Sequence, residues 1–193
     1  MNIYTLSVSL YHTFSSYKVI RFYRNATIQE LKGCNRYVLD RMTVLGVAVF
    51  ATRSVHGEVT FERTAGGTKI VADFSRLPAG EHGFHIHRAG DLRGEGCKKA
   101  CAHYHIGPAA NHGGPPGSKG DRHTGDLGNI SSTQTRYTFS LKGVKVEDLW
   151  GRSLIVHADP DDLGKGDSED SKTTGHSGKR IACAVIGRTM DCD

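Results

Sequence analysis

The amino-acid sequence predicts an all-β fold. Short apolar or alternating runs, typical of strands, are separated by segments rich in Gly, Pro, Asp and Ser. We identify no internal repeat and no convincing amphipathic helix. The 193 residues are 37% hydrophobic, enough for one domain with a sizeable core. These features favour a sandwich or barrel of short antiparallel strands.

Six runs carry the strand pattern: residues 44–50, 56–63, 69–74, 136–141, 152–157 and 180–186. The second and third runs flank Ala65-Gly66-Gly67, a hairpin-like connection. Two long polar stretches, about residues 88–135 and 158–179, separate the later runs. Loops of this length in a compact domain are typically functional or disordered.

The first 41 residues differ in composition from the rest. They hold five of the seven tyrosines and a net charge of +4 (six basic, two acidic), whereas residues 42–193 have 19 basic and 18 acidic residues. The pattern of a secretory signal is not found, because the first Lys is at position 18 and polar residues interrupt the apolar stretch. We interpret residues 1–41 as an extension and residues 42–193 as the domain. The extension is disordered, a targeting segment, or the product of a start codon placed upstream of Met42.

Histidine is the most informative residue type in this chain. The formal net charge of +5 suggests an anionic partner such as nucleic acid, but four of those charges lie in residues 1–41. Seven of the 11 histidines fall between positions 82 and 123: His82, His85, His87, His103, His105, His112 and His123. Such a concentration favours metal binding. No apolar run is long enough to span a bilayer.

The spacing of these histidines predicts two ligand groups. His85 and His87 are two residues apart, so on a strand both rings face one side while Phe84 and Ile86 face the other. The second group, three imidazoles and a carboxylate suited to a tetrahedral zinc shell, is His103, His112, His123 and Asp126. Another histidine, His157, ends an apolar strand and would present its ring at the strand edge.

Several segments that follow one another in a fixed order along the chain indicate a protein family more specifically than any single histidine does. They are residues 83–91 (GFHIHRAGD), 112–115 with 122–129 (HGGP, RHTGDLGN), 152–157 with 161–166 (RSLIVH, DDLGKG) and 178–187 (GKRIACAVIG). These segments resemble the copper, zinc and C-terminal signatures of the copper/zinc superoxide dismutases. The resemblance covers about residues 43–188. It implies a Greek-key β-barrel or flattened β-sandwich in which two long functional loops wall the metal site.

The resemblance implies a role for each site residue. One copper ion per subunit would be held by His85, His87, His103 and His157. One zinc ion per subunit would be held by His103, His112, His123 and Asp126, with the His103 ring shared by both metals. The Asp161 carboxylate would link one ring of each set, and Arg180 would attract the substrate anion beside the copper. A disulfide would join Cys97 and Cys183.

The implied activity is superoxide dismutation, with Arg180 and His103 as catalytic residues. Superoxide would reduce Cu(II) and release oxygen while His103 takes up a proton. A second superoxide would then take an electron from Cu(I) and that proton to give hydrogen peroxide. The alternative is a non-catalytic copper/zinc-binding or copper-handling module on the same fold. All four copper positions and Arg180 are present, which favours the enzyme.

Some positions depart from the family pattern. His105 stands where Asn is common and is either a spectator or a rival ligand. Cys101 is an additional thiol that could compete with Cys97 for its disulfide partner. In the last loop Thr173 replaces the usual lysine, and Lys172 is one position away. We therefore expect altered guidance of the substrate anion.

The resemblance also implies a homodimer and admits a copper chaperone as a partner. Ala89 replaces a common large aromatic at the dimer surface and Arg188 replaces an apolar residue, while Trp150 is either an interface anchor or part of the core. We expect neither nucleic acid nor a membrane as a partner. A disulfide normally indicates an oxidising compartment, but this family is an exception, and we predict a cytoplasmic location.

Overall fold

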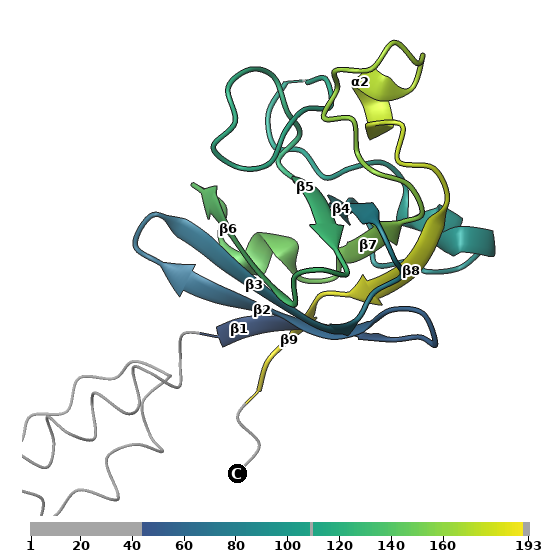
Figure 1. The fold of residues 1–193 in the computed structure, drawn as a ribbon. Coiled ribbons are helices and arrows are strands. Elements are labelled where there is room, and N and C mark those ends of the chain that lie inside the picture. Colours follow the sequence, from purple (N-terminus) through teal and green to yellow (C-terminus); the bar gives the residue numbers. More distant parts are fainter. Residues whose placement is uncertain (1–43, 109, 191–193) are drawn as a thin grey trace, which may run out of the picture. The chain divides into compact units, whose positions relative to one another are not determined.

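The computed structural model describes residues 44–108 and 110–190, and the predicted extension lies outside this range. Two antiparallel sheets pack into a sandwich (Figure 1). The strand order is β6-β3-β2-β1-β9 in the first sheet and β5-β4-β7-β8 in the second. Strand β7 returns beside β4 after the chain has formed β5 and β6, a connection of Greek-key type. The all-β prediction is confirmed.

The strands are β1 (Val44–Ala51), β2 (His56–Thr64), β3 (Gly67–Arg76), β4 (Glu81–His87), β5 (Asp126–Ser131), β6 (Arg136–Lys142), β7 (Ser153–His157), β8 (Arg180–Val185) and β9 (Gly187–Arg188). Three short helical segments join them: η2 (Glu95–Ala100), η3 (Val146–Leu149) and α2 (Ser171–Thr174). No helix in the described ranges has the length and apolar character needed to cross a membrane.

The six predicted strands correspond to β1, β2, β3, β6, β7 and β8 to within a few residues, and β4, β5 and β9 are not among them. The spacing of His85 and His87 anticipated a strand at β4, whereas nothing in the sequence indicated β5. It lies inside the stretch predicted as a loop, where it pairs with β4. Its sequence hides the strand pattern because Asp126 and Asn129 are polar and Gly128 has a φ of 80°. The first long loop therefore ends before Asp126.

The core lies between the two sheets and is centred on a cluster of phenylalanines. The Phe84 ring on β4 lies 5.8 Å from that of Phe74 on β3, centroid to centroid, and 6.4 Å from that of Phe50 on β1. Both faces of β4 are buried from His82 to His87. One face supplies Phe84 and Ile86 to the core, and the other carries the paired histidines.

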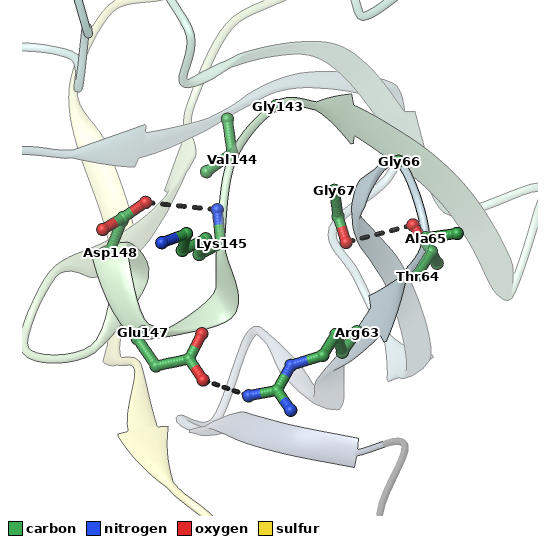
Figure 2. A pocket seen from close by; sticks show the side chains of 10 residues that line it. All are labelled: Arg63, Thr64, Ala65, Gly66, Gly67, Gly143, Val144, Lys145, Glu147 and Asp148. Atoms are coloured by element: carbon green, nitrogen blue, oxygen red, sulfur yellow. Dashed lines mark hydrogen bonds and ion pairs between the residues drawn. The ribbon is translucent and has the colours of Figure 1, made fainter.

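A separate cavity of about 740 Å³ lies between the β2–β3 hairpin and the β6–η3 connection (Figure 2). Arg63 donates a hydrogen bond to Glu147 across it, and Lys145 also lines it. None of the histidines or acids predicted to bind metal contributes to this cavity.

Candidate metal centre

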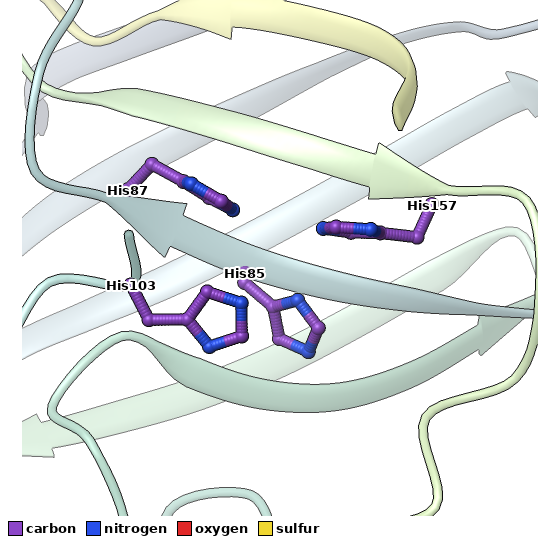
Figure 3. A group of neighbouring side chains, drawn as sticks. All are labelled: His85, His87, His103 and His157. Atoms are coloured by element: carbon purple, nitrogen blue, oxygen red, sulfur yellow. The ribbon is translucent and has the colours of Figure 1, made fainter. Parts of the chain in front are cut away.

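Four histidine rings from three parts of the chain converge beside the second sheet (Figure 3). His85 and His87 project from β4, His157 projects from the end of β7, and His103 comes from the long loop, where it forms an isolated bridge with His87. Each ring offers a nitrogen within 4.8 Å of the others. All four side chains are buried, so these nitrogens face each other without bulk water.

The inward nitrogens of the four rings have no hydrogen-bond partner. They are His85 Nδ1, His87 Nε2, His103 Nε2 and His157 Nε2. Their other nitrogens contact, in the same order, Asp161 Oδ2 (2.9 Å), the Cys101 carbonyl (2.8 Å), Asp126 Oδ1 (2.8 Å) and the Gly178 carbonyl (3.2 Å). Buried polar atoms are rarely left unpaired. Four imidazole nitrogens fixed from outside and unpaired inside fit a bound copper ion.

The second group contains one carboxylate oxygen and three Nδ1 atoms from His103, His112 and His123. Asp126 Oδ1 lies 2.8, 3.1 and 3.3 Å from these three nitrogens in that order, and the Nδ1 atoms of His103 and His112 are 3.3 Å apart. Ligands about 2.0–2.1 Å from a tetrahedral zinc ion lie roughly 3.3 Å from each other. The donor set therefore fits zinc, and His103 belongs to both groups through its two nitrogens.

Asp161 connects the two groups. Its Oδ2 lies 2.9 Å from His85 Nε2 and its Oδ1 lies 2.7 Å from His112 Nε2. Asn129 holds its backbone, donating from Nδ2 to the Asp161 carbonyl and accepting the Asp161 N–H at Oδ1. Gly175 packs so closely behind this carboxylate that a Cβ would collide with Asp161 Oδ1 and His112 Nε2. The sequence indicated no role for Asn129 or Gly175, apart from the place of Asn129 in the RHTGDLGN segment.

The electrostatics of the site favour neutral rings at His85 and His157 in the four-histidine group and an ionised carboxylate at Asp126 in the second group. Burial, followed by the charges of His103 and His157, lowers the pKa of His85 well below its usual value, and burial lowers that of His157 to about 4. Burial alone would raise the pKa of Asp126, but hydrogen bonds from three histidines hold it far below its usual range. Neutral imidazole and ionised carboxylate are the ligand forms of these groups.

His112 shows where a cation is favoured. Burial lowers its pKa, but its contacts with Asp126 and Asp161 outweigh burial and raise the pKa to about 9. The two carboxylates thus favour positive charge at this point. A zinc ion bound to Asp126 and the His112 ring would supply that charge in place of a proton.

Arg180, at the start of β8, is held beside the four-histidine group. Its Nη1 donates to the Cys97 carbonyl (2.8 Å) and its Nη2 donates to the Cys101 carbonyl (2.6 Å). The Cys101 carbonyl also accepts the hydrogen bond from His87 Nδ1. The predicted disulfide between Cys97 and Cys183 ties η2 to β8. The Cys101 carbonyl thus positions both the His87 ring of the four-histidine group and the Arg180 guanidinium. The sequence did not indicate this link.

The additional histidine and thiol lie outside both ligand groups. His105 Nε2 donates to the Pro108 carbonyl and its Nδ1 accepts the Thr124 N–H. Both ring nitrogens are therefore engaged outside the ligand groups, which favours a spectator over a rival ligand. Cys101 is an exposed free thiol, and the disulfide forms with Cys97 instead.

Comparisons with known proteins agree with this geometry. The family model for copper/zinc superoxide dismutase matches residues 55–186. A superoxide dismutase [Cu-Zn] of Paramecium bursaria Chlorella virus 1 is 46% identical over 140 residues, covering 69% of this chain and 73% of that protein. Extracellular superoxide dismutases [Cu-Zn] of Caenorhabditis elegans and Haemonchus contortus are 42% and 45% identical over 137 residues, 68% of this chain, and the matches cover 60% and 73% of those proteins.

Among solved structures, the clock protein EA4 matches with a TM-score of 0.66 and 32% identity, covering 77% of this chain and 96% of that one. The fold and the two ligand groups are those of a β-sandwich protein with two adjacent candidate metal sites that have the His103 imidazole in common. The chain belongs to the copper/zinc superoxide dismutase family.

The cytoplasmic location predicted from the sequence is wrong. Both nematode relatives are named extracellular enzymes. The prediction set aside the ordinary meaning of a disulfide, which is an oxidising compartment, in favour of a family exception.

Replacing Asp161 should weaken both metal sites, because its carboxylate orients one ring of each. We expect Asp161→Asn to lower the affinity for copper and zinc by about 10- to 100-fold, the usual cost of losing such a partner. Competition with a chromophoric chelator measures both affinities. Asp167→Asn, an exposed position in the same loop, is the control. Equal affinities in the two variants would contradict the role of Asp161.

Proposed function

We propose that this chain converts two superoxide anions and two protons into oxygen and hydrogen peroxide. The copper ligands in this proposal are His85, His87, His103 and His157. The zinc ligands are His103, His112, His123 and Asp126. The observation that carries the proposal is the set of four buried, unpaired imidazole nitrogens beside the Arg180 guanidinium. Such a donor set suits a metal that changes oxidation state.

The copper ion, when bound, supplies the one-electron chemistry, accepting an electron from one superoxide and returning one to the next. His103 would hold copper through Nε2 and zinc through Nδ1. With Nδ1 occupied by zinc beside Asp126, Nε2 would be the nitrogen of this ring that either holds copper or, when it does not, carries one of the protons needed for peroxide. The His103 ring therefore serves as both ligand and proton carrier.

Arg180 supplies a fixed positive charge for the substrate anion. Two carbonyls hold its guanidinium, so the side chain is oriented before substrate arrives. Neither carbonyl carries a formal charge that would neutralise it. Arg180 thus attracts superoxide, and the proton on the His103 ring is available at the same site.

A non-catalytic metal-binding module is the less favoured function. Such a module would lack a copper-side ligand or the anion-binding cation, and this chain has all of them. The names of the nematode relatives and the Cys97–Cys183 disulfide support an extracellular location.

We also propose that the chain forms a homodimer. Val49 on β1 and Val185 on β8 are large apolar side chains left 56% and 40% exposed. Gly90 packs against Val185 and the Gly151 carbonyl, which leaves a surface of small and apolar groups. Trp150 packs partly against the core and donates from Nε1 to the Leu45 carbonyl. The guanidinium of Arg188 lies 5.2 Å from the centroid of the Trp150 ring.

Metal analysis of the full chain with a superoxide assay tests the proposed activity. We expect about one copper and one zinc per chain. His157→Ala should lose copper and turnover but keep zinc, because His157 belongs only to the copper-side group. The exposed His56 provides the control, and His56→Ala should keep both metals. A copper-loaded wild-type chain that binds zinc alone and does not turn over would contradict the proposal.

Changing Arg180 should reduce anion capture without removing metal. We expect Arg180→Glu to lower kcat/KM for superoxide by at least about tenfold at low ionic strength. Arg180→Lys should fall less, since it keeps the charge but cannot span both carbonyls. Pulse radiolysis measures the rates, and copper and zinc contents are measured on the same samples. Unchanged kcat/KM in Arg180→Glu would remove this residue from the mechanism.

Light scattering after size exclusion tests the dimer. The wild type should have a mass near twice the 21.0 kDa of the chain, and Val185→Asp should reduce it to that of one chain. A buried unpaired charge would oppose association. Ile106→Asp, at an apolar loop position that is 50% exposed, should remain dimeric. A wild-type mass of 21.0 kDa would exclude the homodimer.

A further inference from the structure

Two exposed lysines line a cavity together with Arg180. One, Lys98, belongs to η2, and the other, Lys179, directly precedes Arg180. This cavity has a volume of about 500 Å³, and its lining residues are Glu95, Gly96, Lys98, Gly178, Lys179 and Arg180. The cavity therefore joins the anion-binding guanidinium to two further positive charges.

The charge of this cavity is largely uncompensated. Three basic residues and one acid line it, a net charge of +2 (3 − 1). Within residues 44–108 and 110–190, no carboxylate lies within 4.0 Å of the ammonium group of Lys98 or Lys179. A concave surface with a net positive charge raises the local concentration of small anions.

One lysine of the loop between β7 and β8 is directed elsewhere. Lys172 donates its ammonium hydrogen bond to the Gly164 carbonyl and lines a different cavity, next to His112. In the same loop Asp170 pairs with His176, with Nδ1 and Oδ1 2.7 Å apart. Lys172, Asp170 and His176 thus make contacts within the loop that follows β7, whereas Lys98 on η2 and Lys179 at the end of that loop are exposed.

We propose that Lys98 and Lys179 collect superoxide at the entrance and deliver it to Arg180. The inference rests on the proposed dismutase function and assigns the guidance of the anion to η2 and the residue before Arg180. These lysines are positioning residues that act through Arg180, because the cavity that they line includes none of the proposed metal ligands. Their effect should act over the Debye length, roughly 30 Å at 0.01 M salt and 3 Å at 1 M.

The double variant Lys98→Gln/Lys179→Gln tests the proposal by pulse radiolysis on the metal-loaded full chain. We expect kcat/KM to fall by about three- to tenfold at 0.01 M ionic strength and to match the wild type near 1 M. Copper and zinc contents should stay unchanged. The control Lys142→Gln/Lys145→Gln removes the same charge from the β6–η3 region, where Lys145 lines the cavity of Figure 2. It should change the rate by less than about twofold.

A second readout does not depend on turnover. Inorganic phosphate is titrated into the metal-loaded protein, and its binding is followed by the line width of the ³¹P signal. The Lys98/Lys179 variant should broaden the signal several-fold less than the wild type and the control. If both double variants behave alike in the rate and in the line width, guidance by Lys98 and Lys179 is wrong. An inactive wild type would instead refute the dismutase function, and the phosphate titration would still decide whether the two lysines gather anions.

Discussion

The arrangement of the site depends on one strand that is buried on both faces. On β4, Phe84 and Ile86 pack into the core while His85 and His87 face the ligand groups. Because side chains alternate along a strand, a shift of one residue in register would put imidazoles into the core and phenylalanine into the metal site. The apolar packing of one face thus fixes the positions of the rings on the other. The core and the metal centre are therefore specified together.

Because the four histidine rings are buried, each of their nitrogens requires a hydrogen-bond partner or a metal ion. In the four-histidine group, the nitrogen of each ring that faces away from the other rings has a hydrogen-bond partner, but the nitrogen that faces the other rings has none. An unsatisfied buried polar atom costs about 1–3 kcal/mol, so the site without metal is unfavourable at four adjacent points. Metal binding removes this cost, and its free energy adds to that of folding. The long loop carrying His103, His112 and His123 gains the most, because it has little regular structure of its own.

Strand alternation and histidine spacing are local signals, and they predicted the fold class, six strands, the His85/His87 pair and the second ligand group. The addition of His103 and His157 to that pair came from the family resemblance. The sequence did not predict β5, where polar residues and Gly128 obscure the alternation. Contacts made through the backbone were also beyond its reach. The Cys101 carbonyl, which accepts from His87 and Arg180, has no signature in the identity of residue 101. The direction of a long flexible side chain such as Lys172 depends on tertiary contacts, so sequence alone could not place its ammonium group.

The backbone at Cys101 makes this dependence on tertiary contacts concrete. Its φ of 65° and ψ of −150° lie in a region that favours glycine and strains other residues. The surrounding contacts must therefore hold it, and they do: Arg180 and His87 bind its carbonyl, its N–H donates to the Lys98 carbonyl, and the disulfide anchors the preceding turn. The turn that carries Lys98 is thus connected through one carbonyl to a copper-side ring. A change in η2 would therefore disturb both the Arg180 guanidinium and the His87 ring, and the disulfide restrains this short segment against β8.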